Sequence, residues 1–178
     1  MKKIFAVILL AATLLSLLGG CGEKEPAGSG IDGDKVLDKF EALIVGSEIG
    51  DDYTLTRLPK TELPESGETR QAMVITDKIL GYTYHLSMRS NRAGEAYRVE
   101  ITLQDGDMAY MTLPILCLYL IDALELPLGD RMGFCEDMGL LSAEPGGTKS
   151  VAGWMLMALT VDNTISFSAT YFPEATNP

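Results

Sequence analysis

Two stretches of strict alternation between apolar and polar residues constrain the fold of this chain more than any other feature. From Leu80 to Met88 every second residue is apolar, and the pattern resumes from Tyr97 to Leu103. Successive side chains of a β-strand point to opposite faces, so this period of two predicts two strands, each with one buried face. Because only a short polar segment, residues 91–94, separates them, we expect the two strands to pair as antiparallel neighbours.

The apolar faces also predict how these strands pair. A register that keeps both apolar faces on the same side of the sheet also places His85 opposite Glu100 on the polar face. Asp105-Gly106 is typical of a hairpin turn and predicts a third strand at residues 108–110. The expected pairs are Met88 with Tyr97, Leu86 with Val99, Tyr84 with Ile101, Leu103 with Met108 and Ile101 with Tyr110.

Helical periodicity marks two further segments. Asp34 begins a run of apolar residues at helical spacing that ends near Gly46, which predicts an N-terminal amphipathic helix. Pro114 suits the first turn of a helix, and residues 115–126 are apolar on nearly every side. The second helix is therefore expected to be buried against the sheet.

The remaining segments complete one domain. Asp162-Asn163 is expected to turn a final hairpin formed by residues 151–161 and 164–172. Shorter pieces are expected as a strand at 53–56, an edge strand at 72–76 and a short helix near Cys135, with loops elsewhere in 47–70 and 127–150. Together these elements predict a single α+β domain over residues 34–173, with an antiparallel sheet of five to seven strands.

The first 21 residues have the pattern of an export signal. Lys2 and Lys3 precede an apolar run from Ile4 to Leu18, which is too short for an ordinary membrane span. The segment Leu18-Gly19-Gly20-Cys21 resembles the lipobox of bacterial lipoproteins. That resemblance implies removal of a signal peptide (1–20), acylation of Cys21, for instance with palmitate, and attachment to a membrane outside the cytoplasm, in the cell envelope. Residues 21–33, rich in Gly, Glu, Pro and Ser, are expected to form a flexible tether.

Charge limits the class of partner. Removing residues 1–20 takes away two lysines and no acid, so the net charge goes from −11 to −13. A chain this acidic is repelled by nucleic acid backbones and anionic lipid headgroups, so we expect no nucleic acid partner. The expected partners are membrane lipid, through acylated Cys21, and either a protein or a small-molecule ligand.

Few residues are candidates for a chemical site. The chain has one histidine, His85, which excludes multi-histidine zinc sites, and none of its acidic pairs has the spacing of a calcium loop. We therefore expect no metal, and the absence of a phosphate-binding glycine loop leads us to expect no cofactor. His85 and Glu100 form the candidate polar pair, and no catalytic residue is assigned. Cys117 and Cys135 either form a disulfide, which an export compartment allows, or stay as free buried thiols.

One strand of the final hairpin is apolar on both faces. Trp154, Leu156 and Ala158 are expected in the core, which leaves Met155, Met157 and Leu159 on the opposite face. Either the first helix or a loop covers these three side chains, or they line a groove for a ligand or partner.

These observations favour a membrane-anchored extracytoplasmic lipoprotein that acts as a non-enzymatic ligand- or protein-binding module. One alternative is an envelope hydrolase acting through His85 and a carboxylate such as Glu100, and another is a structural component of the envelope. A pocket that contains both side chains would favour the hydrolase, and a flat sheet face would disfavour it.

Overall fold

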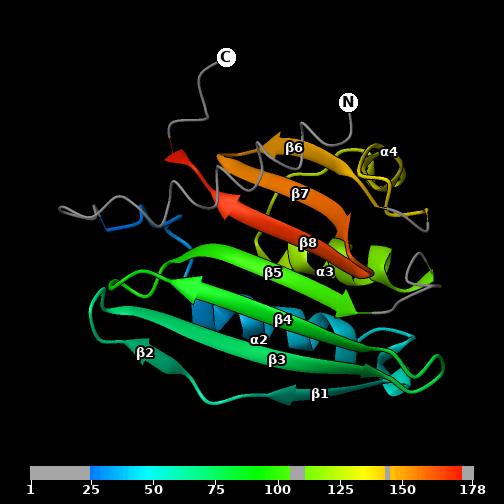
Figure 1. The fold of residues 1–178 in the computed structure, drawn as a ribbon, viewed down its shortest axis with the longest axis horizontal. Coiled ribbons are helices and arrows are strands. Elements are labelled where there is room, and N and C mark those ends of the chain that lie inside the picture. Colours follow the sequence, from blue (N-terminus) through cyan, green and yellow to red (C-terminus); the bar gives the residue numbers. More distant parts are fainter. Residues whose placement is uncertain (1–24, 105–110, 143–144, 174–178) are drawn as a thin grey trace.

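The computed structural model describes residues 25–104, 111–142 and 145–173, and within them the protein has an α+β fold. Eight strands form one sheet with the order β1-β3-β4-β5-β8-β7-β6, and β2 also pairs with β3. Every pairing is antiparallel (Figure 1). The expected antiparallel sheet is confirmed, but it has eight strands, so the prediction of five to seven was too low.

The elements have the following bounds. The strands are β1 (Tyr53–Arg57), β2 (Thr61–Leu63), β3 (Glu68–Asp77), β4 (Thr83–Ser90), β5 (Ala96–Gln104), β6 (Gly147–Val151), β7 (Trp154–Val161) and β8 (Thr164–Tyr171). The helices are α2 (Gly33–Val45), a short 3-10 turn (Gly50–Asp52), α3 (Leu113–Ala123) and α4 (Arg131–Asp137). In the part of the chain that the structure describes, no helix is long and apolar enough to cross a membrane.

α2 forms where the amphipathic pattern predicted it. Oδ1 of Asp32 caps its start by accepting hydrogen bonds from the backbone N–H groups of Asp34 and Lys35 at 2.9 and 3.4 Å. Its apolar stripe, which includes Phe40, is buried in the core. Arg57 of β1 ties the polar side of this helix to the sheet through ion pairs with Asp38 and Glu41.

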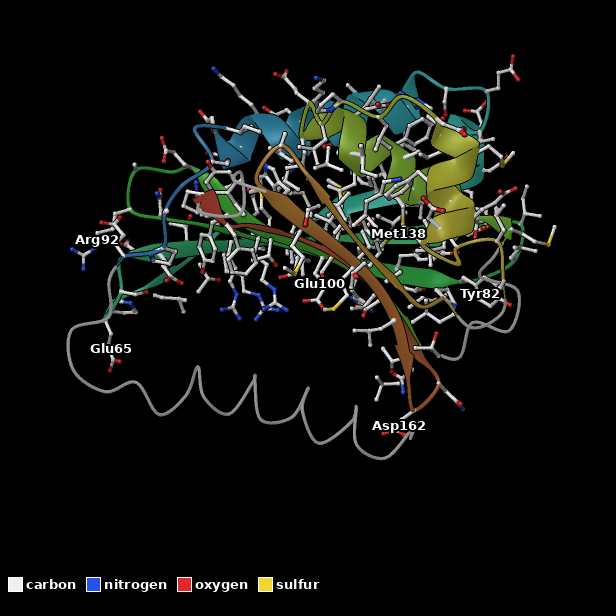
Figure 2. The ribbon with its side chains drawn as sticks, turned by 90° about the horizontal axis from the view of Figure 1, so that it is seen from above. Glu65, Tyr82, Arg92, Glu100, Met138 and Asp162 are labelled. Carbon is white, nitrogen blue, oxygen red and sulfur yellow. The ribbon has the colours of Figure 1, made fainter. Side chains whose placement is uncertain are left out.

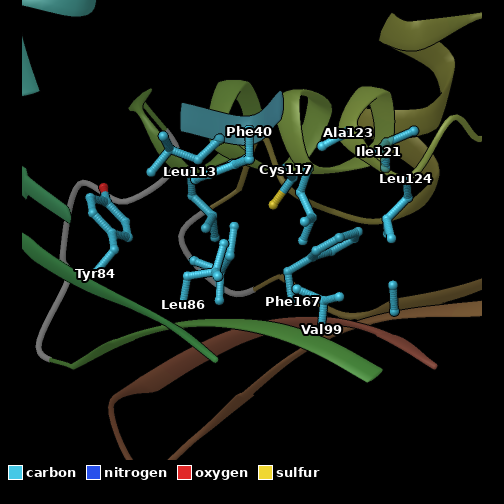
Figure 3. Close-up of a cluster of buried hydrophobic side chains, with 14 of the residues drawn as sticks. Phe40, Tyr84, Leu86, Val99, Leu113, Cys117, Ile121, Ala123, Leu124 and Phe167 are labelled. Atoms are coloured by element: carbon cyan, nitrogen blue, oxygen red, sulfur yellow. The ribbon is translucent and has the colours of Figure 1, made fainter. Parts of the chain in front are cut away.

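α3 is the buried central helix. Pro114 lies in its first turn, and Leu116, Cys117 and Leu120 are fully buried. Figure 2 shows the described helices α2, α3 and α4 on one side of the sheet, and Figure 3 shows α3 side chains meeting Leu86, Val99 and Phe167 from the strands. One core therefore lies between the helices and the inner face of the sheet, and the other face has no α-helix over it among the described residues.

The register of β4 with β5 differs from the predicted one. Met88 lies opposite Val99, Leu86 opposite Ile101 and Tyr84 opposite Leu103, a shift of two residues along β5. The pairing is irregular after Arg89, where Arg98 is opposite Arg89 but Ala96 is opposite Ser90. Tyr97 is therefore the extra residue of a β-bulge, and Ala96 fills the core position that Tyr97 was expected to take.

The sheet is also wider than the alternation predicted. β3 is an internal strand of ten residues, not an edge strand, because β1 and β2 pair along its outer side. β6 adds a strand in a region expected to be irregular. The third strand predicted at 108–110 lies outside the described residues, and β8 occupies the second side of β5, with Phe167 opposite Ile101. The final hairpin is confirmed: Asp162 and Asn163 both have positive φ, as a type I′ turn requires.

The end of the expected tether is attached to the domain. The backbone N–H of Ala96 donates to the carbonyl of Ile31 at 2.8 Å, and the Ser29 hydroxyl donates to the carbonyl of Ala96 at 2.6 Å. Gly33 packs so closely here that a Cβ would lie 2.2 Å from Oγ of Ser90. Residues 29–33 thus run beside the turn between β4 and β5 as part of the domain.

Candidate functional site

The candidate site is on the face of the sheet that points away from the α-helices, which we call the open face. Figure 2 shows Glu100 on this side, opposite to Met138 on the helical side. A depression of about 310 Å³ lies over the central strands β3, β4 and β5. Its lining is Leu58, Arg70, Ala72, His85, Leu86, Ser87, Arg89, Arg98, Glu100 and Thr102.

Three arginines form a row across this depression. Arg70 of β3 lies opposite Arg89 of β4, which in turn lies opposite Arg98 of β5. Adjacent strands are about 5 Å apart, so the backbone positions of the row span about 10 Å. Like charges directly opposite each other destabilise a sheet, so this arginine row (Arg70, Arg89 and Arg98) costs the fold some stability.

The carboxylates of the domain only partly balance the arginine row. Arg98 makes an ion pair with Glu100 at 3.3 Å, and Nε of Arg70 donates to the Ser87 hydroxyl at 3.2 Å. Among the described residues, neither Arg70 nor Arg89 has a carboxylate within 4.0 Å. Arg57, by contrast, has two on the helical side. The depression thus holds three positive charges and one negative charge, with His85 counted as neutral.

Tyr97 borders the arginine row at the bulge. Its hydroxyl donates to Oε2 of Glu68 at 2.7 Å, and the nearby Arg89 acts on the pKa of the phenol in the lowering direction. Burial, and then the hydrogen bond to Glu68 and the charge of that carboxylate, raise the pKa of Tyr97 to about 12. The phenol stays protonated at neutral pH and holds Glu68 beside the row.

The predicted cross-strand pairing of His85 with Glu100 is wrong. The register differs from the predicted one by two residues, one at the turn and one at the Tyr97 bulge, so His85 lies opposite Thr102 and Glu100 opposite Ser87. The two side chains are diagonal neighbours, and both line the depression. The structure thus brings the candidate polar pair into one site, although not face to face.

Met155, Met157 and Leu159 also lie on the open face. Met157 follows Glu100 in one cross-sheet row, with Ser168 between them, and Met155 is 40% exposed. The first helix does not cover these side chains, because the apolar stripe of α2 packs against the inner face of the sheet. An apolar strip on β7 therefore adjoins the depression.

Cys117 and Cys135 are free thiols in the structure, not a disulfide. Both residues are buried: Cys117 is completely buried, and Cys135 has an exposed fraction of 2%. Burial raises the pKa of both thiols, with a smaller contribution from Cys135 at Cys117. Each thiol acts as a small apolar core group, because a neutral buried sulfur is a poor nucleophile.

A second cavity, of about 250 Å³, lies between the β3–β4 turn and the start of α3. Tyr53, Asp77 and the exposed Ile79 are among its lining residues. Asp77 is buried, but its carboxylate already has hydrogen-bond partners, because Oδ1 accepts hydrogen bonds from the backbone N–H groups of Ile79 and Leu80. Burial, with the charge of Asp77, raises the pKa of Tyr53. This cavity holds few polar groups that are free to bind a ligand.

Sequence reasoning placed no functional role on Arg70 or Arg89. The row appears only when the three strands β3, β4 and β5 are aligned. No group of three or more His, Cys, Asp or Glu side chains within the described ranges could hold a metal ion. Cys21, the predicted lipidation site, lies outside those ranges.

The chain has no match among protein-family models, curated proteins or solved structures.

Proposed function

We propose that this protein is a lipid-anchored extracytoplasmic binding module that holds a ligand or partner on the open face of its sheet. The observation that carries the proposal is the depression of about 310 Å³, lined mostly by charged and polar side chains on a face over which the described residues place no α-helix. Small-ligand sites are concave and present a few convergent polar groups, and this volume is at the small end of their range. The adjoining strip of Met155 and Met157 supplies apolar contact area.

The anchor rests on the N-terminal sequence. Lys2 and Lys3, the apolar run and Leu18-Gly19-Gly20-Cys21 support export and acylation. Each buried methylene contributes about 0.8 kcal/mol to membrane attachment, so two acyl chains would hold the protein durably. We expect the wild-type chain to fractionate with membranes and to incorporate labelled palmitate, and a Cys21→Ser variant to lose the label. Equal labelling of both chains would contradict the anchor.

Binding is tested by thermal unfolding of the full-length protein in a neutral detergent. Trp154 is the only tryptophan and is 2% exposed, so its fluorescence reports unfolding directly. A ligand that binds only the folded state raises the midpoint as its concentration rises. The screen should cover neutral, cationic and anionic small molecules and peptides, and a flat result across all of them would contradict the proposal.

A pair of matched variants locates the binding face. Met157→Asp puts a charge on the open face, and Met132→Asp puts the same charge on α4, where Met132 is 62% exposed. We expect a ligand found in the screen to bind Met132→Asp normally and Met157→Asp at least several-fold more weakly. Equal binding by both folded variants would place the ligand elsewhere.

An envelope hydrolase is a second candidate, because His85 and Glu100 line the same depression. The ion pair of Glu100 with Arg98 opposes this role by occupying one carboxylate oxygen. The two functions differ in what a His85→Ala variant does. It would abolish turnover by a hydrolase, whereas a binding module has no turnover and should keep most of its ligand affinity.

A further inference from the structure

We propose that the ligand of the open face is a small phosphate monoester, bound through its phosphate by the arginine row. This inference rests on the proposed function, and it names the ligand class of the same depression. Three of the six arginines in the chain lie at directly opposed positions on β3, β4 and β5. Their mutual repulsion is unfavourable in the unoccupied sheet, and a bound anion would relieve it.

Charge sets the valence of the ligand. Among the residues that line the depression, Arg70, Arg89 and Arg98 against Glu100 leave an excess of two positive charges, while Glu68 lies beside this lining with its carboxylate hydrogen-bonded to Tyr97. A phosphate monoester carries about −1.5 to −2 at pH 7, which matches this excess, whereas a phosphate diester carries only one negative charge. The net negative charge of the whole chain acts at longer range and is screened over about 8 Å at physiological salt.

Geometry favours phosphate over a carboxylate. Each guanidinium offers planar paired donors that match the oxygens of phosphate or carboxylate. Three of them at about 5 Å intervals are better matched by a group with three terminal oxygens around one atom than by a group with two. Arg89, the middle residue, has no carboxylate partner among the described residues and is placed to make the central contact.

The surroundings favour a small ligand over an extended polyanion. The β2–β3 segment at the adjoining end of the sheet carries Glu62, Glu65 and Glu68, of which the first two are exposed. Those carboxylates would repel a nucleic acid or an anionic membrane surface laid across the row. A volume of about 310 Å³ leaves room for a phosphate with a small organic group beside Ser87 and Thr102.

The test is calorimetric titration of the full-length protein in neutral detergent with three small probes. Methyl phosphate represents the monoester, dimethyl phosphate the singly charged diester, and succinate the doubly charged dicarboxylate. We expect methyl phosphate to bind at least tenfold more tightly than either of the others. Tighter or equal binding of succinate or of dimethyl phosphate would overturn the inference, and so would the absence of methyl phosphate binding.

Variants tie the binding to the row. Arg89→Gln should weaken methyl phosphate binding about tenfold, the usual loss for one charge-assisted hydrogen-bonding partner. Arg92→Gln is the matched control, because Arg92 lies beyond the end of β4 and is not among the lining residues. Equal affinities for the two variants would overturn the inference. If Arg89→Gln fails to fold by Trp154 fluorescence, Arg70→Gln takes its place with the same expectation.

The outcomes also separate this inference from the proposed function. A screen in which another class of molecule raises the unfolding midpoint, while methyl phosphate does not bind, would reject the phosphate ligand and leave the binding module standing. A screen in which nothing shifts the midpoint would reject both.

Discussion

Replacing Tyr84 with Phe tests how strongly the core couples folding to pH. The Tyr84 side chain is fully buried, and its hydroxyl shares a hydrogen bond with the Thr112 hydroxyl at the start of α3. Burial raises the pKa of Tyr84 to about 12, from an ordinary value of 10, although the hydrogen bond to Thr112 acts in the opposite direction. Ionising this phenol inside the folded protein is therefore unfavourable.

The sign and size of the effect follow from linkage between protonation and folding. Below pH 10 the phenol is protonated in both the folded and the unfolded state, so its full contribution is present. As pH rises from 10 towards 12, the unfolded chain loses its proton first, and the free energy of unfolding falls. At roughly 1.4 kcal/mol per pKa unit, the loss is about 1 kcal/mol at pH 11 and approaches about 3 kcal/mol well above pH 12.

Urea unfolding followed by Trp154 fluorescence measures this loss. At pH 8, Tyr84→Phe should be less stable than the wild type by about 1 kcal/mol, because it loses the hydrogen bond. Between pH 8 and pH 11 the wild type should lose about 1 kcal/mol more than the variant, whose ring cannot ionise. Tyr97 titrates in both proteins and cancels in this comparison, and Tyr53 cancels except for the part of its raised pKa that comes from the charge of Tyr84, which is smaller than the effects of burial and of Asp77. Parallel loss of stability in the two proteins would refute the reasoning.

Two further predictions concern the core. Cys117 and Cys135 should resist a thiol reagent in the native protein and both react in denaturant, while a mass 2 Da lower with no such reaction would show a disulfide instead. Phe167→Ala should cost about 3–5 kcal/mol in urea unfolding, because this buried ring meets Phe134 edge-on at 6.3 Å. A loss below about 1 kcal/mol would contradict that packing.

Strong periodicity accounts for the parts of the fold that were predicted correctly. The alternation in β4, β5 and β8 and the helical spacing in α2 reflect burial of one face, which leaves a direct mark on the residue pattern. β2 and β6 carry no such mark: Thr61 and Glu62 are exposed, and Thr148 and Ser150 are exposed as well. Edge strands gain their stability from backbone pairing, which leaves no apolar pattern in the sequence. The residue pattern therefore predicted loops for the segments that form β2 and β6.

The candidate site depended on the register of β4 with β5, and that register depended on the turn between them and on one inserted residue. Ser90 pairs with Ala96, one position away from the expected register, and the bulge at Tyr97 adds a second position, which separates His85 from Glu100 and sets Arg89 against Arg98. Nothing in the alternation marks that bulge, because Tyr97 is as apolar as the core residues that follow it. Arg70 joins the row only because β3 pairs with β4 through its full length.

In the lipid-anchored protein that we propose, the attachment of residues 29–33 to the β4–β5 turn would limit how far the domain can stand from the lipid surface. From Cys21 to Ser29 the chain can span at most about 29 Å when fully extended. With Cys21 acylated as proposed, the turn beside Ala96 stays within about 29 Å of the bilayer. Arg98 of the arginine row lies two residues after Ala96. Ligand capture would therefore take place in the layer directly above the membrane, and a longer segment before Ser29 would raise that height without changing the fold.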